Sequence, residues 1–477
     1  MIKVDCFRGQ TVGVFGLARS GLSAIDALRA GGANVFAWDD AETARLTAVQ
    51  KGAMAGPWER WPWADLKAVI LSPGIPLTHP QPHAIVDCAV EAHVEIIGDI
   101  ELFARSIRPD RNAVGLAPVI VITGTNGKST TTALIGHILQ VCGLDAQVGG
   151  NIGKPALELA APGAKTVYVL EVSSYQIDLS PGLIADVAVL TNLSPDHIDR
   201  HGSMAEYAAV KEKLLTQAAP GGYIAVGVDD PDSSAIYSKL AAARGNDAVA
   251  VSVGKVLGRG IFVIDGKVYD AWDQPVVGIG DFKQAPHLPG VHNWQNAALA
   301  YAAVKRTVRD PRSVMTAITR FPGLAHRMED IGRIGKVRFI NDSKATNADA
   351  AARALACYSE IFWIAGGKPK QGGIAELAPY FPKIRRAYLI GEAAHAFGQT
   401  LEGAVDTVQS GTLANALKAA LADAQASDAG EPVVLLSPAC ASFDQFRDFE
   451  ERGDVFREMV KSLIDSHAPD ARKEVAS

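Results

Sequence analysis

Short apolar runs alternate along the 477-residue chain with longer stretches whose apolar residues recur at helical spacing. The runs are four or five residues long, are rich in Val, Ile, Leu and Ala, and end in glycine or polar residues. Such runs are typical of strands buried on both faces of a parallel sheet, and their alternation with helices is typical of βα units. The pattern predicts an α/β protein with strands at residues 11–15, 34–38, 68–71, 119–122, 166–170, 186–190, 337–340, 361–365, 387–390 and 433–436.

The most informative stretch follows the fourth of these strands and reads Thr-Gly-Thr-Asn-Gly-Lys-Ser at 123–129. A glycine-rich turn lets the backbone wrap closely round an anion, and the next helix would present its N-terminus to phosphate. Lys128 can reach the outer phosphates, and the hydroxyl of Ser129 or Thr130 is placed to hold Mg²⁺. Ile122 stands where the general motif has its first glycine, so an ordinary glycine turn is the alternative. We predict a nucleoside triphosphate site.

Two further strands of the same predicted sheet are followed by residues of the types that can bind metals. Glu171 follows the strand at 166–170, and His197 lies in the polar stretch after the strand at 186–190. Both strand ends belong to one βα alternation, so these side chains are expected to converge on the phosphate loop. A carboxylate is a natural Mg²⁺ ligand, whereas histidine is less usual, and a structural role for His197 is the alternative.

The first part of the chain resembles the opening of a dinucleotide-binding fold. A strand, a glycine-bearing turn at 16–21, a helix, a second strand and the acidic Asp39 follow one another. The glycines do not match G-x-G-x-x-G, which argues against redox chemistry. The rigid turn at 72–76 follows the third strand, at the sheet edge where α/β proteins bind ligands. We predict a nucleotide-like ligand here, with simple scaffold turns as the alternative.

The connecting segments predict three domains, because a chain of this length is too long for one hydrophobic core. Residues 108–118 are polar and contain glycine and proline, as linkers do, and 321–327 is interpreted as a second hinge. Asp265-Gly266 is the expected turn of an antiparallel hairpin at 261–269. We predict a Rossmann-like domain at 1–112, a P-loop ATPase-like α/β domain at 113–325 and a Rossmann-like α/β domain at 326–477.

Composition excludes several classes of protein. The formal net charge is −6 and no basic block is present, which argues against nucleic acid as a partner. The N-terminus lacks an apolar signal core and no apolar run is long enough to span a membrane, so a soluble, cytoplasmic protein is expected. The five cysteines are scattered and predict neither a disulfide framework nor a metal site.

Taken in order, the motifs resemble those of the Mur ligases, the ATP-dependent amino-acid ligases of peptidoglycan synthesis. The matching positions are 123–128, Glu171, 196–197, 292–296, 326–327 and 341–347. The stretch at 437–446, together with Phe449, is similar to that of the members that add D-glutamate. The D-N-P-R signature of the members that add diaminopimelate or lysine is absent.

This resemblance implies a reaction, substrates and partners. D-Glutamate would be joined to UDP-N-acetylmuramoyl-L-alanine through an acyl phosphate, with ATP consumed and Mg²⁺, expected as two ions, bound. The first domain would bind the UDP end of the substrate, and the enzyme would be a monomer. Lys211 would be carbamylated, as in the family's Tyr-x-x-x-Lys, which begins here at Tyr207; Lys213 lies nearby.

The resemblance also implies roles for individual residues. The expected catalytic residues are Lys128, His197 and Lys211. Expected ATP contacts, some of them across the cleft between domains, are Gly124, Thr125, Asn126, Gly127, Lys128, Ser129, Thr130, Asn296, Arg327 and Asp342. Expected metal ligands are Ser129, Glu171, His197 and carbamylated Lys211. The UDP-substrate is expected at Ala18, Arg19, Asp39, Ser72, Gly74 and Asn151. D-Glutamate is expected at Lys344, Thr346, Lys370, Ser442 and Phe449, with Lys368 as a rival to Lys370.

Two other classes of protein stay open from the residues alone. A nicotinamide-dependent dehydrogenase would use the first domain but would leave Lys128 and Ser129 without a role. A nucleotide-driven switch or motor would use the phosphate loop but would not explain the polar clusters of the third domain. Nearer rivals are other Mur ligases and folylpolyglutamate synthetases, which differ in the amino acid and in the acceptor.

Overall fold

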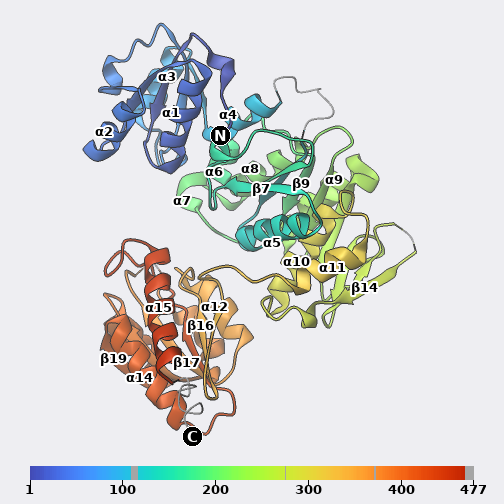
Figure 1. Ribbon diagram of the computed structural model, residues 1–477, viewed down its shortest axis with the longest axis vertical. Coiled ribbons are helices and arrows are strands. Elements are labelled where there is room, and N and C mark those ends of the chain that lie inside the picture. The colour runs from blue at the N-terminus through green and yellow to red at the C-terminus, as the bar shows by residue number, and fades with distance from the viewer. Residues whose placement is uncertain (109–116, 274, 370–371, 468–477) are drawn as a thin grey trace, which may run out of the picture. The chain divides into compact units, whose positions relative to one another are not determined.

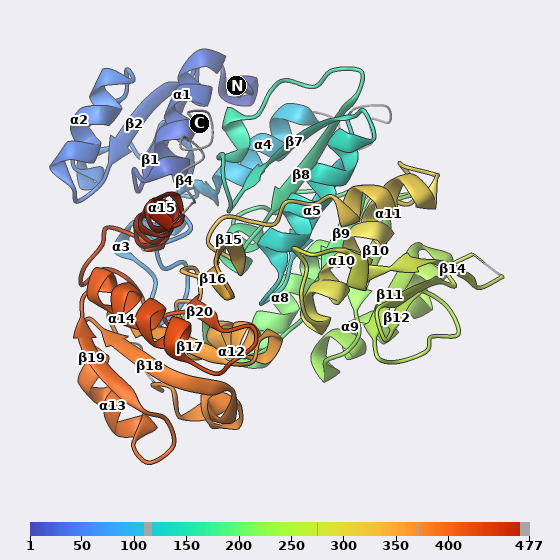
Figure 2. The ribbon, with the colours of Figure 1, turned by 60° about the horizontal axis from the view of Figure 1, so that its bottom comes forward.

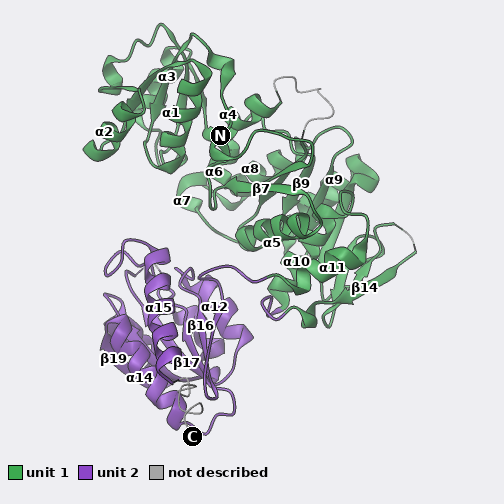
Figure 3. Ribbon diagram, viewed as in Figure 1, with its two compact units in different colours: residues 1–285, 291–321 green, residues 286–290, 322–477 purple. Residues whose placement is uncertain are grey.

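The computed structural model describes residues 1–108, 117–273, 275–369 and 372–467 (Figure 1). Lys370 and most of the predicted linker at 108–118 lie outside the described residues. The chain divides into two compact units, which are residues 1–285 with 291–321 and residues 286–290 with 322–477 (Figure 3). The first unit contains two sheets and the second contains one. The three domain ranges given above stay a prediction.

The first sheet is parallel, with the strand order β3-β2-β1-β4-β5 that is typical of Rossmann-like folds. Its strands are β1 (Thr11–Phe15), β2 (Asn34–Trp38), β3 (Met54–Ala55), β4 (Leu66–Leu71) and β5 (Glu95–Ile97). The α-helices of this region are α1 (Arg19–Gly31), α2 (Glu42–Gln50), α3 (Ala84–Glu91) and α4 (Asp99–Ile107). The predicted Rossmann-like architecture of this region is confirmed.

The second sheet has nine strands in the order β14-β13-β12-β11-β10-β9-β6-β8-β7. It is parallel from β7 to β12, and β13 and β14 continue it as antiparallel strands. Its strands are β6 (Val119–Thr123), β7 (Asp145–Gly150), β8 (Thr166–Glu171), β9 (Val187–Leu190), β10 (Tyr223–Gly227), β11 (Ala248–Val253), β12 (Ile261–Ile264), β13 (Lys267–Asp270) and β14 (Val277–Asp281). Asp265 and Gly266 both have positive φ, as the predicted two-residue hairpin turn requires.

Helices flank this second sheet and carry several of the expected site residues. They are α5 (Lys128–Val141), α6 (Ser174–Asp178), α7 (Ile198–His201), α8 (Met204–Thr216), α9 (Pro231–Arg244), α10 (Val291–Val304) and α11 (Pro311–Thr319). Figures 1 and 2 show α5 and α10 side by side, and the two helices pack against each other. This packing brings Asn296 of α10 to the end of the phosphate loop, where α5 begins.

One hydrophobic core joins the two sheets of the first unit. It includes buried residues of β1 and α4 as well as residues of β6, β8 and β9. At the junction, Phe103 of α4 packs edge-on against Tyr168 of β8, with ring centroids 5.1 Å apart. Because the core is continuous, both sheets belong to one compact unit.

The second unit is a six-stranded sheet with the order β15-β16-β20-β17-β18-β19, parallel except for β15. Its strands are β15 (Glu329–Ile334), β16 (Val337–Asn341), β17 (Ile361–Gly366), β18 (Ile384–Ile390), β19 (Thr407–Gly411) and β20 (Val433–Leu436). Its helices are α12 (Ala348–Cys357), α13 (Ala394–Leu401), α14 (Leu413–Ala426) and α15 (Phe449–His467). Two cores form on it, one with α12 and α13 and the other with α14 and α15. Among the described residues of the chain, no helix has both the length and the apolar character to cross a membrane.

Candidate active site

The phosphate loop lies between β6 and α5 and has the backbone geometry that its sequence predicts. Gly127 precedes the helix with φ +82°, in the left-handed region. A Cβ atom at this position would lie 2.2 Å from Oδ1 of Asn296 on α10, so only glycine fits here. Ser129, which is buried, and Thr130 follow in the first turn of α5. The N-terminus of α5, where the helix dipole favours negative charge, therefore follows directly on this turn.

Side chains from the end of β9 hold this loop in shape. The backbone oxygen of Asn126 accepts hydrogen bonds from Thr191 Oγ1 at 2.6 Å and from Asn192 Nδ2 at 3.0 Å. Lys128 Nζ donates to the carbonyl oxygens of Gly124 at 2.9 Å and Thr125 at 2.8 Å. The sequence analysis did not single out Thr191 and Asn192. Hydrogen bonds within the chain thus shape the loop.

Lys211 of α8 lies beneath the loop and is 1% exposed. Its Nζ donates to Gly124 O at 3.0 Å and to Thr123 Oγ1 at 3.3 Å. Burial, and to a lesser extent the positive charge of Lys128, hold the pKa of Lys211 well below its usual value. A neutral amine is the form that reacts with carbon dioxide. Lys213 is only partly buried and does not line the adjoining cavity, so the geometry favours Lys211 over this rival.

Glu171 at the end of β8 has the environment of a metal ligand. It is 2% exposed, and its Oε1 accepts a hydrogen bond from Asn151 Nδ2 at 2.8 Å. Its Oε2 is buried without a hydrogen-bond partner. A buried carboxylate oxygen without a partner is costly unless a cation or donor is bound. No group of three His, Cys, Asp or Glu residues able to hold a metal exists among the described residues, so Mg²⁺ here would also need hydroxyl, phosphate or water ligands, as Mg²⁺ commonly takes.

His197 precedes α7 with φ +54°, and its Nε2 lies 3.4 Å from Asp196 Oδ2. Although its side chain is 49% exposed, partial desolvation lowers its pKa, and the charges of Lys128 and Lys211 lower it further against the effect of Asp196. The neutral imidazole that results has a ring nitrogen able to bind a metal. The sequence analysis placed His197 near the phosphate loop, and the structure does so too.

Two cavities in the first unit bring the predicted residues together. One, of about 350 Å³, is lined by the three expected catalytic residues and by Gly74 and Asn151. The other, of about 200 Å³, is lined by Ala18 and Arg19 at the start of α1 and again by Asn151. Neither cavity is lined by Asp39 or Ser72. Instead, Asp39 Oδ2 accepts a hydrogen bond of 2.6 Å from the backbone of Leu17, which shapes the loop before α1.

Arg200 and His201 were not predicted as site residues, yet both support this region. Arg200 donates hydrogen bonds of 3.0 Å to the carbonyl oxygens of Gly74 and Ile75, and its guanidinium lies 4.6 Å from the Tyr175 ring centroid. His201 stacks on the same Tyr175 ring, and its Nε2 lies 2.8 Å from Ser174 Oγ. Burial lowers the pKa of His201 to about 4. These contacts join the turn after β4 to the segment that holds His197.

Asp99, at the start of α4, lines the smaller cavity and was also missed. It is 3% exposed, and its Oδ1 has no hydrogen-bond partner. Burial raises its pKa from 3.8 to about 6. The folded protein therefore binds the proton of the Asp99 carboxyl more tightly than the unfolded chain does. Ionisation of Asp99 then lowers the stability of the folded protein, and this loss grows as pH rises from 3.8 and reaches its full size above about 6.

We expect Asp99→Asn to stabilise the protein at pH 8 by about 3 kcal/mol, the free energy that corresponds to this change in pKa. At pH 4.5 the gain should be smaller by about 2 kcal/mol, because the carboxyl is then largely protonated in the folded state. Urea unfolding at both pH values measures the difference. Asp65→Asn, at an exposed position, is the control. An equal gain at both pH values would contradict the assignment of the effect to ionisation.

In the second unit, the expected ATP and D-glutamate residues come from several segments. Asp342, Lys344 and Thr346 follow β16, Ser442 follows β20, Arg327 precedes β15, and Phe449 begins α15. Arg327 lies between two residues of positive φ, His326 and Met328. Asp342 is buried; its Oδ1 accepts from Met328 N at 3.1 Å and its Oδ2 from Ser437 Oγ at 2.8 Å. Burial raises the pKa of Asp342 to about 7. Asn296, by contrast, lies in the first unit beside the phosphate loop.

The expected D-glutamate residues lie on three segments of this unit. Lys344 Nζ lies 4.3 Å from the centroid of the Phe449 ring. Ser442 is 2% exposed, and Thr346 is half-buried. Lys370 is not among the described residues, so the choice between it and Lys368, whose side chain is exposed, stays open.

Comparison with known proteins identifies the family. The model of the Mur ligase middle domain matches residues 122–304, and that of the Mur ligase, glutamate ligase domain matches 326–440. A protein of Phenylobacterium zucineum named UDP-N-acetylmuramoylalanine--D-glutamate ligase is 51% identical over 470 residues, which is 98% of this chain and 99% of that protein. The chain belongs to the Mur ligase family.

Other relatives place it among the D-glutamate-adding Mur ligases. Proteins of the same name from Caulobacter sp. and Brucella abortus are 51% and 49% identical, and each alignment covers 97% of this chain and 98% of the relative. This identity sets aside the dehydrogenase and switch interpretations and the folylpolyglutamate synthetases. The resemblance that was drawn from the motifs is thereby confirmed.

Solved structures agree with this Mur ligase fold. UDP-N-acetylmuramate-alanine ligase from Thermotoga maritima has a TM-score of 0.58 at 16% identity, over 95% of this chain and 99% of that one. A pseudomurein peptide ligase type C from Methanothermus fervidus has a TM-score of 0.56 at 16% identity, over 95% and 100%. At such low identity the likeness supports the fold alone. The predicted α/β fold class is confirmed, and the structure forms it with three sheets.

Proposed function

We propose that this Mur ligase joins D-glutamate to UDP-N-acetylmuramoyl-L-alanine, with hydrolysis of ATP to ADP and phosphate, in the cytoplasmic stage of peptidoglycan synthesis. The observation that carries the proposal is the convergence of Lys128, His197 and Lys211 on one cavity beside the phosphate loop. The names of near full-length relatives support the choice of amino acid and acceptor. We also propose that the enzyme acts as a monomer.

The reaction begins with phosphoryl transfer. A carboxylate oxygen of the L-alanine residue attacks the γ-phosphorus of ATP, the bond to the β–γ bridging oxygen breaks, and an acyl phosphate and ADP form. Lys128 Nζ donates to Gly124 O and Thr125 O. With ATP bound, its N–H groups would instead donate to the transferring phosphoryl group. The amine of D-glutamate then attacks the acyl carbon, loses a proton, and displaces inorganic phosphate from a tetrahedral intermediate.

The residues at the phosphate loop fit the expected metal and carbamate. Bound Mg²⁺ would neutralise the charge that gathers on the transferring phosphoryl group. Two Mg²⁺ ions are expected, and they would be held by Ser129, Glu171, His197 and carbamylated Lys211. The partnerless Oε2 of Glu171 supports this role. The lowered pKa of Lys211, caused mainly by burial, supports carbamylation because it favours the amine form that reacts with carbon dioxide. Carbamylation would convert a cation into an anion able to approach the metal.

The remaining substrates take the other predicted residues. ATP would also contact Asn296, Arg327 and Asp342. The UDP-substrate would lie along the cavities of the first unit, with Ala18, Arg19, Gly74 and Asn151 lining them and Asp39 and Ser72 shaping the loops nearby. D-Glutamate would be held in the second unit by Lys344, Thr346, Ser442 and Phe449. Lys370 or Lys368 would pair with one of its carboxylates.

The proposal predicts strict dependence on one amino acid. Phosphate release from ATP with UDP-N-acetylmuramoyl-L-alanine should require D-glutamate and should stay near background with L-glutamate, L-alanine, diaminopimelate or no amino acid. Release with a different amino acid would overturn the specificity and keep the family. Release without any amino acid would contradict a ligase whose acyl phosphate is protected from water.

A further inference from the structure

Arg452 of α15 is a buried cation bonded to neutral groups. It is 1% exposed, and burial lowers its pKa to about 10, so it stays charged at neutral pH. Its guanidinium donates to Ser343 Oγ at 2.9 Å, Ser343 O at 2.7 Å, Cys440 O at 3.1 Å and Ala441 O at 3.3 Å. Burying a charge is costly unless its donors are well satisfied, and here four oxygen atoms share that task.

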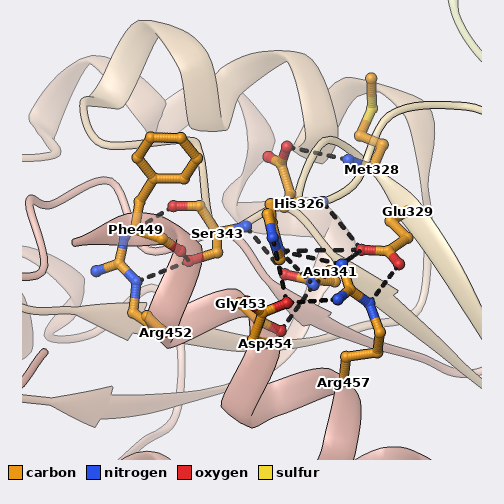
Figure 4. Close-up of polar contacts among 11 residues, drawn as sticks. His326, Met328, Glu329, Asn341, Ser343, Phe449, Arg452, Gly453, Asp454 and Arg457 are labelled. Carbon is orange, nitrogen blue, oxygen red and sulfur yellow. Dashed lines mark hydrogen bonds and ion pairs between the residues drawn. The ribbon is translucent and has the colours of Figure 1, made fainter. Parts of the chain in front are cut away.

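These acceptors belong to the two loops that carry the proposed D-glutamate residues, and Figure 4 shows Arg452 beside Ser343 and Phe449. Ser343 is the neighbour of Lys344, in the loop after β16, and Ala441 is the neighbour of Ser442, in the loop after β20. Ser343 Oγ also donates to the carbonyl oxygen of Phe449 at 2.9 Å. One guanidinium therefore fixes the spacing of three segments.

We propose that Arg452 is a positioning residue for D-glutamate, which holds the loops at 343–346 and 440–442 at the separation that the amino acid requires. The inference rests on the proposed function and adds to it a residue outside the contacts assigned above. A planar guanidinium can serve acceptors on two loops at once, whereas a lysine ammonium is a point charge on a flexible stem.

The helix that carries Arg452 is anchored independently of it. Phe456 and Val460 of α15 are buried in the core beside α14. Arg457 pairs with Glu329 at 2.7 Å. The carbonyl oxygen of Gly453 accepts from Asn341 Nδ2 of β16 at 3.0 Å. A Cβ at Gly453 would lie 2.1 Å from His326 Nδ1, which shows how closely the helix approaches the segment before β15. Loss of the guanidinium should thus free the loops more than it frees the helix.

Steady-state kinetics of the full chain test the inference. In Arg452→Met we expect the KM for D-glutamate to rise by a factor of about 10 to 100, because displacement of binding groups by about 1 Å has effects of this size. The KM for the UDP-substrate should stay within about twofold of wild type, because the residues proposed to bind it lie in the first unit. The KM for ATP should rise less than that for D-glutamate, because the phosphate loop and Asn296 also lie in the first unit. Arg452→Lys should be intermediate, because it restores the charge and some of the donors.

A second measurement reports on the loop without using activity. Cys440 is 1% exposed, and its carbonyl oxygen accepts from Arg452. We expect iodoacetamide to modify Cys440 faster in Arg452→Met than in wild type, as followed by peptide mass spectrometry, with the exposed Cys6 as internal reference. Val460→Ala is the matched control, because it removes core contacts of the same helix and leaves the loops alone.

The outcomes separate this inference from the proposed function. A folded Arg452→Met protein with unchanged KM for D-glutamate and unchanged Cys440 reactivity would overturn the inference. A rise in the KM for ATP alone would also overturn it, because Arg452 would then act on the nucleotide through Asp342. If wild type itself shows no D-glutamate-dependent turnover, the proposed function fails. If Arg452→Met does not fold, the same readouts in Arg452→Lys decide.

Discussion

Lys128→Ala is expected to lower ligase turnover by a factor on the order of 10³ or more while the protein stays folded. Lys128 is the only charged side chain of the phosphate loop at 123–129, and its Nζ already points into the loop, toward the carbonyl oxygens of Gly124 and Thr125. The transferring phosphoryl group carries negative charge that no neutral loop donor could balance as well. The side chain is half-buried, so its truncation leaves no large cavity.

Phosphate release with all three substrates measures this effect, and thermal unfolding reports on the fold. Lys165→Ala is a suitable control, because Lys165 is an exposed lysine of the same unit. Lys128→Arg keeps the charge but changes its shape, and it should recover little activity if a compact ammonium is needed. Full activity of Lys128→Ala would contradict the assignment of the nucleotide site.

Lys211→Met is expected to be as inactive as Lys128→Ala, and at least as stable as wild type. Activity should be lost because methionine cannot form the carbamate that would approach the metal. Stability should be kept because a buried lysine with a lowered pKa must give up its proton on folding, a cost that methionine lacks. That cost increases as pH falls below the pKa of the unfolded lysine, so the gain in stability should be larger at pH 6 than at pH 9.

The matched control is Lys213→Met, two residues further along α8, which should keep most of its activity. ¹³C-labelled bicarbonate should give a carbamate signal in wild type and in Lys213→Met, and that signal should be missing in Lys211→Met. Turnover of wild type should also decline in buffer depleted of carbon dioxide. If the signal is lost only in Lys213→Met, the carbamylated residue is Lys213 and the assignment to Lys211 is wrong.

The sequence predicted most of the inner strands, because burial leaves a clear signal. β6 and β8 are buried along their whole length and appear as continuous apolar runs. The edge strands β14, β15 and β19 were missed, because they are half-exposed and contain glycine and charged or polar residues. The interior strands β10 and β11 were missed as well, although their burial is complete or nearly so.

The residues that could not be predicted act through partners that are distant in the sequence. Arg452 bonds to Ser343, 109 residues earlier, and Arg200 bonds to Gly74, 126 residues earlier. Neither belongs to a local motif that indicates a role, since an isolated arginine on a helix is usually a solvated surface residue. The phosphate loop is different, because its chemistry is contained in seven consecutive residues and can be recognised without the fold.

The way β9 supports the phosphate loop has a consequence for protein synthesis. Thr191 and Asn192, which bind the backbone oxygen of Asn126, follow it by 65 and 66 residues. A ribosome adds about 5–20 residues per second, so the nascent loop waits several seconds for its partners. The strands β1, β2 and β4 are all complete by Leu71, long before that point. The Rossmann-like region can therefore assemble early during translation, whereas the nucleotide site forms later.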